Sequence, residues 1–246
     1  FFIYSVAIAV LVTEYTTSAT KSAQKEERQR QRLASMEAAI ARLEAEAADD
    51  QPDGVFVEDA VIVFGDLAVL ARAGAVSRRG ERDTIARVVA ASGLETVEIV
   101  EPGTLDGGDV LKVGRTVYVG ASSRTNAAGI AQLAALLDAR GWTVVTRPVE
   151  RVLHLKSGVT ALPDGTIVGY EPLVDDREGY AAFAAVPEEH GTAVVVLDER
   201  TVLMSADAPR TAELWRGRGL DVVTVPISEF EKLEGCVTCL SVRLRD

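Results

Sequence analysis

The stretch V-I-V-F-G-D-L-A-V-L at residues 61–70 predicts the unit from which the chain is built. Two apolar runs flank Gly65-Asp66, and a two-residue turn of this kind between short apolar runs is typical of a β-hairpin. A helical stretch at about Glu81–Ala91 and a strand at Thr96–Val100 follow. We therefore predict a ββαβ unit that begins at residue 61.

The same order of elements returns three more times. The expected elements of the second unit are strands at Val110–Val113 and Thr116–Val119, a helix at Ala127–Arg140 and a strand at Thr143–Val145. The third unit runs from Val159 through a turn at residues 163–165 to a strand at Ala193–Leu197. A shorter fourth unit has a strand at Val202–Ser205, a helix at Arg210–Arg218 and a strand at Val222–Val225.

The repeat has a period of ~40–50 residues, which is the range of radial repeat architectures. A single unit cannot bury the face of its own sheet, but units packed around an axis can, with their helices outside. We therefore expect an α/β propeller whose active site lies where strand ends and loops meet at the axis. The alternative is a plain open α/β sheet.

The segment before residue 52 fits the repeat less well. Residues 1–12 are almost wholly apolar, but a membrane span needs about 20 such residues. We interpret this run as one or two buried strands, with the tail of a membrane or signal segment as the alternative. Apolar residues at three- and four-residue steps predict a helix over Lys21–Glu46.

Composition places limits on the partners. The chain has 246 residues, and 37 acidic residues against 26 Lys and Arg give a net charge of -11. Nucleic-acid binding relies on a surplus of Lys and Arg, so we expect no nucleic-acid partner and favour a small cationic ligand. Two cysteines exclude a disulfide scaffold and indicate a reducing compartment, so we expect a cytoplasmic protein.

Both cysteines lie in G-C-V-T-C-L-S-V at residues 235–242, before an expected strand at Cys239–Leu244. Three interpretations stay open: half of a zinc site, a redox dithiol, or one nucleophilic and one buried structural cysteine. A nucleophilic cysteine needs a histidine to activate it. His154 opens the third unit and is the candidate, although an isolated histidine in an apolar run is often only a core residue.

Two pairs of acids are candidates for binding a cation. Glu58 and Asp59 are adjacent after an apolar run, and Asp106 and Asp109 flank a Gly-Gly pair. Adjacent carboxylates repel each other unless a cation lies between them, and a guanidinium takes bidentate hydrogen bonds from carboxylates. The alternative is that these aspartates only form turns.

Two arginines lie between the second strand and the helix of their units, which are equivalent positions in a ring. Arg78 and Arg124 there could bind a substrate carboxylate with both arms of the guanidinium. Alternatively, they pair with Glu81 or a neighbouring acid.

Taken together, the motifs resemble those of the dimethylarginine dimethylaminohydrolase family, which has the five-bladed pentein α/β-propeller fold of guanidine-modifying enzymes. They are P-D-G-V-F-V-E-D-A at 52–60, S-R-R at 77–79, T-L-D-G-G-D-V at 104–110, S-x-R-T-N at 122–126, L-H-L-K-S at 153–157, S-E-F-E-K at 228–232 and G-C-V-T-C-L-S-V at 235–242. The resemblance implies one α/β-propeller domain over residues 1–246. Residues 52–246 are the family-like region, and residues 1–51 form a divergent or incomplete first blade.

The resemblance also implies a role for each motif residue. Cys239 would be the nucleophile, His154 the general acid and base, and Asp106 the residue that orients His154. The substrate's guanidinium and α-amino end would be received by Asp53, Glu58 and Asp59. Its α-carboxylate would be held by Arg78 and Arg124, and the backbone carbonyl of Leu233 would accept a further hydrogen bond. Cys236 has no role in the family.

The implied reaction is the hydrolysis of Nω-methylated arginines to citrulline and methylamine or dimethylamine, through a thiouronium on the cysteine. It needs no metal or organic cofactor and no partner other than the small-molecule substrate; a membrane is not expected, and a homodimer is compatible with it. The first alternative is an arginine deiminase, but that family has F-x-R-D and H-x-D where this chain has residues 56–59 and 154–156. The others are a catalytically inactive pentein-fold binding protein and a redox protein that uses Cys236 and Cys239.

Overall fold

The computed structural model describes residues 51–243. The apolar run at residues 1–12, the expected helix over 21–46 and the expected first blade lie outside these residues. The described part contains four three-stranded sheets. Their strands are β1 (Val61–Phe64), β2 (Leu67–Leu70) and β3 (Glu95–Glu98); β4 (Val110–Val113), β5 (Thr116–Ala121) and β6 (Thr143–Pro148); β7 (Thr160–Ala161), β8 (Ile167–Gly169) and β9 (Phe183–Ala185); and β10 (Val194–Val196), β11 (Thr201–Ser205) and β12 (Asp221–Val225).

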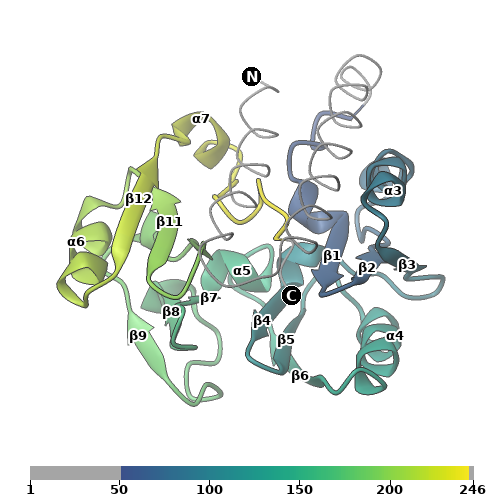
Figure 1. Cartoon of the computed structure of the whole chain (residues 1–246), viewed down its shortest axis with the longest axis horizontal. Helices are drawn as coiled ribbons and strands as arrows, with labels where there is room; N and C mark the ends of the chain where they lie inside the picture. Colours follow the sequence, from purple (N-terminus) through teal and green to yellow (C-terminus); the bar gives the residue numbers. More distant parts are fainter. Residues whose placement is uncertain (1–50, 244–246) are drawn as a thin grey trace, which may run out of the picture.

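Every sheet has the same topology, in which the first two strands form an antiparallel pair and the third strand runs parallel to the second. Three long helices connect the second and third strands of their units: α3 (Glu81–Ser92), α4 (Ala127–Asp138) and α6 (Pro209–Gly217). They lie at the outside of the molecule, whereas the short α5 (Leu155–Gly158) lies near its centre (Figure 1). This arrangement is the propeller of ββαβ units that the repeat predicts.

The hairpin turns explain why the repeat could be read from the sequence. Gly65, Gly114 and Gly165 occupy the turns of the first three sheets with φ of 62°, 56° and 85°. Glycine takes this left-handed conformation without steric strain. In the first hairpin, Phe64 pairs with Leu67 across the turn, so both strands expected in residues 61–70 are confirmed.

The third and fourth units differ from the expectation. The run at 193–197 does not close the third sheet: β10 pairs antiparallel with β11 and begins the fourth sheet. The third sheet is closed by β9, and a 3-10 helix, η4 (Glu171–Leu173), lies between β8 and β9 in place of an outer α-helix. The expected strand at the C-terminus is also wrong, since residues 237–240 form a turn and 241–243 are irregular.

Two short 3-10 helices bring the acidic motifs together. η1 (Val57–Asp59) precedes β1, and η3 (Gly107–Asp109) precedes β4. A Cβ on Gly107 would lie 1.9 Å from the backbone oxygen of Glu58, so only glycine permits this approach. The two motifs are therefore held side by side by backbone packing.

The remaining short helices are η2 (Val76–Arg78), η5 (Glu189–Gly191) and α7 (Ser228–Glu231). No helix within residues 51–243 has the length and apolar character needed to cross a membrane.

Candidate active site

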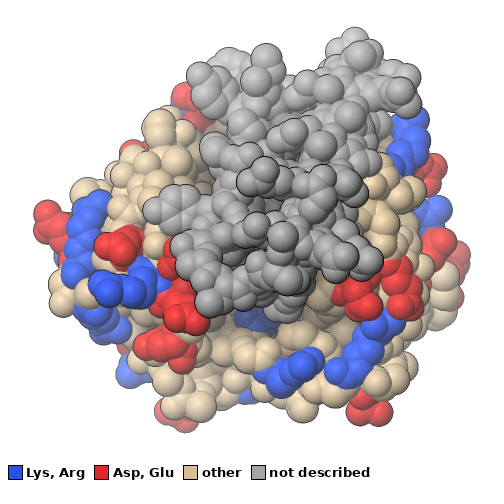
Figure 2. Space-filling view, in the orientation of Figure 1, with Lys and Arg blue, Asp and Glu red and all other residues tan. Residues whose placement is uncertain are grey.

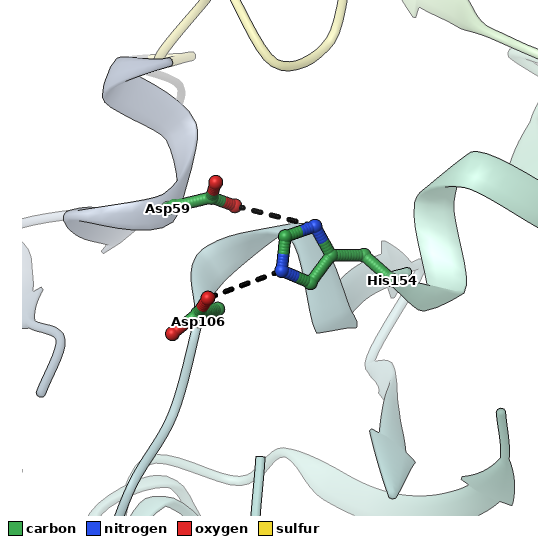
Figure 3. A group of neighbouring side chains, drawn as sticks. All are labelled: Asp59, Asp106 and His154. Carbon is green, nitrogen blue, oxygen red and sulfur yellow. Dashed lines mark hydrogen bonds and ion pairs between the residues drawn. The ribbon is translucent and has the colours of Figure 1, made fainter. Parts of the chain in front are cut away.

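A buried histidine between two carboxylates forms the centre of the site (Figure 3). His154 directly precedes α5 and is 4% exposed. Its Nε2 lies 3.1 Å from Asp106 Oδ2, and its Nδ1 lies 3.8 Å from Asp59 Oδ1. The Nε2 contact is a hydrogen bond, whereas the Nδ1 contact is an ion pair beyond hydrogen-bond distance.

This environment favours the charged form of the imidazole. Burial opposes the charge, but the hydrogen bond to Asp106 and the charges of Asp59 and Asp109 together raise the pKa of His154 to about 9. His154 is therefore an imidazolium at neutral pH, which makes it a proton donor before it can be a base.

Asp106 is held so that its carboxylate cannot turn away from the histidine. It is fully buried, and its Oδ1 accepts a hydrogen bond from the Gly74 backbone N–H at 2.9 Å. Its own N–H donates to Thr125 Oγ1 at 3.1 Å. Oδ2 is left for His154 Nε2, so the expected orienting residue and the expected acid–base residue do meet.

Asp109, the second acid of the L-D-G-G-D motif, has a structural task that the sequence did not reveal. It is fully buried and accepts hydrogen bonds from Ser122 Oγ and Thr125 Oγ1, both at 2.6 Å. It also accepts one from the Leu155 backbone N–H at 2.9 Å, next to His154. Burial raises the pKa of Asp109, although the nearby imidazolium and the two hydroxyl donors oppose this. Asp109 thus fixes the start of α5 and, with it, the histidine.

The glycines of this motif are required by space. A Cβ on Gly108 would lie 2.7 Å from Asp59 Oδ1 and from the His154 ring. The Gly108 N–H donates to the same Asp59 oxygen at 2.9 Å. Gly108 therefore allows the aspartate and the imidazole to approach each other over the backbone.

Arg78 was expected either at a substrate carboxylate or paired with a neighbouring acid. It is 7% exposed, and its guanidinium donates to Asp59 Oδ2 at 2.6 Å and to both oxygens of Glu81 at 2.8 Å. Its Nη2 also donates to the backbone oxygens of Asp53 and Phe56. The alternative, that it pairs with Glu81 or a neighbouring acid, is the arrangement in the structure. Such a pairing holds Asp59 in place.

Asp59 is ionised in this setting. Burial alone would raise its pKa, but the positive charges of His154 and Arg78 lower it below the usual value. Its two oxygens already accept from Gly108 and Arg78, so it stands close to the histidine as a fixed negative charge.

Glu58 is the second acid of the pair, and only one of its two carboxylate oxygens accepts a hydrogen bond. Its Oε1 accepts from Lys156 Nζ at 2.5 Å, whereas Oε2 is buried and has no hydrogen-bond partner among the described residues. Burial raises the pKa of Glu58, and the Lys156 charge opposes this. A buried carboxylate oxygen without a partner is an acceptor for a cationic ligand.

The two cysteines touch each other. Cys239 is 9% exposed, and its Sγ lies 3.1 Å from Cys236 Sγ. The hydrogen bond with Cys236, burial, and the charges of Glu58 and Asp59 all raise the pKa of the Cys239 thiol. Cys239 is thus placed near the acidic pair, and its backbone oxygen accepts from the Glu58 N–H at 3.2 Å.

Three expected ligand residues lie further out. Arg124 is partly buried, 3.6 Å from Asp106 Oδ2, and its Nη1 has no hydrogen-bond partner among the described residues. The Asp53 side chain is exposed, and Leu233 is 65% exposed in the segment after α7. Unlike Arg78, Arg124 keeps donors for an anionic ligand.

Asp59, Asp106 and His154 also have the spacing of a metal site, since one ligand atom from each lies within 4.8 Å of the others. A metal ligand must be a neutral imidazole. With the pKa of His154 raised to about 9, a metal ion would have to displace the proton of the ring.

Two cavities border the site. One, of about 430 Å³, is lined by Glu58, Lys156 and Thr238 among others. The other, of about 470 Å³, is lined by Lys156 and Cys236 among others. Around the described rim, acidic and basic side chains alternate without a continuous basic surface on this face (Figure 2).

The repeated blades and the buried Asp–His–Asp cluster at their inner ends define a pentein-type α/β propeller. A Streptomyces coelicolor protein named N(G),N(G)-dimethylarginine dimethylaminohydrolase is 56% identical over 204 residues, which cover 83% of this chain and 79% of that protein. A Pseudomonas aeruginosa protein of the same name is 39% identical over 197 residues, covering 78% of this chain and 77% of that protein. This chain belongs to the dimethylarginine dimethylaminohydrolase family.

Solved structures agree. A cysteine-to-serine variant of the Pseudomonas aeruginosa enzyme, complexed with citrulline, has a TM-score of 0.74 and 33% identity, covering 87% of this chain and 89% of that chain. The N-terminal domain of ArgZ, an arginine dihydrolase, has a TM-score of 0.72 at 22% identity, covering 89% of this chain and 88% of that chain, which shows the shared fold.

The N-terminal segment matches another family. The sequence profile of Optic atrophy 3 protein (OPA3) matches residues 1–43. These residues precede the first family motif at residue 52 and lie outside the described part. The interpretation of residues 1–51 as a divergent first blade of a single domain stays a prediction.

Proposed function

We infer that this chain hydrolyses Nω-methylated arginines to citrulline and methylamine or dimethylamine. The observation that carries this is the meeting of four separate motifs: the buried His154 bonded to Asp106 lies against the acidic pair beside Cys239. The 56% identity to a named dimethylarginine dimethylaminohydrolase supports the same reaction.

Substrate binding follows from the unpaired groups. We assign the guanidinium to Glu58, whose Oε2 lacks a partner among the described residues, and to the negative field of Asp59. We assign the α-carboxylate to Arg124, whose side chain is partly exposed and whose Nη1 makes an ion pair but no hydrogen bond within residues 51–243. Asp53 and the carbonyl of Leu233 remain the proposed ligands at the outer, amino-acid end. Arg78 acts through Asp59 rather than on the substrate.

The nucleophile becomes active only when the substrate arrives. The hydrogen bond with Cys236, burial, and the carboxylates of Glu58 and Asp59 keep Cys239 a thiol before substrate binds. A guanidinium placed between those carboxylates neutralises their field and lowers the pKa of the thiol. The thiol then releases its proton to solvent water, because His154 is already protonated, and the thiolate attacks the guanidinium carbon held beside it.

His154 handles the protons that follow. Its Nε2 is bonded to Asp106, so Nδ1 is the nitrogen that we assign to transfer. The imidazolium donates a proton to the departing amine, the carbon–nitrogen bond breaks, and an S-alkylthiouronium remains on Cys239. The neutral imidazole then takes a proton from water, the oxygen attacks the same carbon, and the carbon–sulfur bond breaks to release citrulline.

Lys156 favours methylated substrates over arginine. Deiminases have an aspartate at this position of the motif, and here Lys156 occupies Glu58 Oε1 instead. The site therefore offers fewer acceptors to the N–H groups of an unsubstituted guanidinium. Methyl groups can occupy that side without leaving a buried N–H unpaired, a loss that costs ~1–3 kcal/mol per group.

The test is citrulline release from asymmetric dimethylarginine, monomethylarginine and arginine on one preparation, with kcat/KM for each. We expect both methylated substrates to be preferred over arginine by ~5–150-fold. Arginine as the best substrate would restore the deiminase. No turnover, together with binding of dimethylarginine in calorimetry, would identify an inactive binding protein.

A further inference from the structure

Cys236 has no task in the proposed reaction, yet it is in contact with the proposed nucleophile. The two sulfur atoms lie 3.1 Å apart, and both thiols are free. The intervening turn is closed by a hydrogen bond from the Leu240 N–H to the Cys236 carbonyl oxygen at 3.4 Å. A disulfide requires ~2.05 Å between sulfurs, so an approach of ~1 Å by side-chain rotation would form one.

The two thiols differ in their access to small molecules. Cys236 is partly exposed and lines the cavity of about 470 Å³, whereas Cys239 is buried behind it. A water molecule takes ~30 Å³ of liquid volume, so the cavity easily admits a molecule the size of hydrogen peroxide. An oxidant entering by this cavity therefore meets Cys236 first.

Cys236 is also the thiol that ionises more readily of the two. The hydrogen bond with Cys239 lowers the pKa of the Cys236 thiol, and Thr238 Oγ1, at 3.2 Å from its sulfur, acts in the same direction. Thiolates rather than thiols react with peroxides. The accessible sulfur is thus also the more readily oxidised one, with a second thiol in contact to complete the disulfide.

We propose that Cys236 is an oxidation site for hydrogen peroxide, and that its oxidation locks Cys239 in a reversible disulfide. The Cys236 thiolate attacks the O–O bond, which gives a sulfenic acid and hydroxide, and the hydroxide takes a proton to become water. Cys239 then attacks Cys236 Sγ: the S–S bond forms, the S–O bond breaks, and the leaving hydroxide takes the Cys239 proton as a second water. Two thiols lose two electrons in total, and the peroxide gains them.

The functional consequence rests on the proposed function, because a disulfide-bonded Cys239 cannot attack a guanidinium. Peroxide would switch the hydrolase off, and a dithiol would switch it on again by exchange. Without Cys236, a sulfenic acid formed slowly on Cys239 would have no partner and would pass to irreversible oxidation states.

The experiment treats wild type and Cys236→Ser with hydrogen peroxide, stops the reaction with catalase, and measures citrulline formation, free thiols and intact mass before and after dithiothreitol. Wild type should lose both thiols together, fall in mass by two hydrogens and recover its activity. Cys236→Ser should be inactivated at least ~10-fold more slowly, because the sulfur that lines the cavity is gone and Cys239 is buried, and it should not recover fully.

Two results would overturn the proposal: equal rates and equal recovery in the two proteins, or a wild-type mass that only gains oxygen. The thiol count and the mass do not depend on turnover. If untreated wild type released no citrulline, the proposed function would fail, while disulfide formation would still be decided. Cys236→Ala, measured in parallel, shows whether the serine hydroxyl itself affects the result.

Discussion

We expect Asp106→Asn to slow hydrolysis of dimethylarginine by at least ~100-fold, the scale of lost general acid–base catalysis. Asp106 accepts from Gly74 through Oδ1 and from His154 through Oδ2. An amide has only one acceptor oxygen. If that oxygen stays with Gly74, the amide NH2 faces Nε2, which must then lose its proton; if the amide is reversed, its NH2 faces the Gly74 N–H.

The pH dependence of the effect follows from the histidine's environment. The hydrogen bond to Asp106 is the strongest of the interactions that raise the pKa of His154 against burial. Hydrogen bonds to charged groups contribute ~1.5–3 kcal/mol, and 1.36 kcal/mol corresponds to one pKa unit. Its loss should therefore move the pKa of His154 from about 9 to ~7–8. At alkaline pH the variant then lacks the proton that the leaving amine needs.

Two measurements test the role of Asp106. Initial rates of citrulline formation across the neutral and alkaline range give the pH profile, whose alkaline limb should move toward neutrality in Asp106→Asn. The chain has two histidines, so NMR titration of the imidazole protons, with His190→Gln for assignment, gives the pKa of His154 directly. A variant whose His154 still titrates near 9, or which keeps the wild-type rate, would refute the orienting role of Asp106.

Three further predictions concern the cysteines, the arginines and pH. Cys239→Ser should abolish citrulline release while Cys236→Ser keeps most of it, and equal loss in both would favour a redox function. Arg124→Ala should weaken the binding of substrates with a free α-carboxylate but not the binding of their amides; an identical loss of affinity for acid and amide would make Arg124 structural. Arg78→Ala should lower the free energy of unfolding in urea by ~3–5 kcal/mol, because it leaves buried carboxylates unpaired. Folding raises the pKa of His154 from 6.5 to about 9, so protonated His154 adds about 3 kcal/mol to the free energy of unfolding. This contribution is complete below pH ~6.5 and disappears as pH rises through about 9. Wild type should therefore lose more stability than His154→Gln over that range.

The parts of the fold that could be predicted are the hairpins and helices whose signals lie within a short stretch of sequence. The hairpin at residues 61–70 and the helix α4 carry turn glycines and regular apolar spacing, and both were found as expected. The strand β10 was assigned to the wrong sheet because Val194–Val196 is apolar throughout and carries no information about its partner. The third unit also lacks the outer α-helix that would have marked its end.

The site was predictable in its residue types but not in its pairings. The sequence identified Asp106 and His154, and the structure brings them into contact. Arg78 is buried and pairs with Glu81, and its burial could not be read from the sequence motif. The contact between Lys156 and Glu58 joins residues 98 positions apart and depends on the packing of η1 and α5 against η3.

The charges around the nucleophile explain why substrate binding must come before ionisation. Among residues 51–243, five carboxylates and four cationic groups take part in the hydrogen bonds and ion pairs around the site. The carboxylates are Glu58, Asp59, Glu81, Asp106 and Asp109, and the cations are Arg78, Arg124, His154 and Lys156. The carboxylates of Glu58 and Asp59 disfavour a thiolate on Cys239, and a guanidinium bound between them opposes that effect. We therefore expect guanidinium ion, but not urea, to accelerate alkylation of Cys239 by iodoacetamide in a Cys236→Ser background. Equal labelling rates with guanidinium and urea would show that the substrate's charge does not activate the thiol.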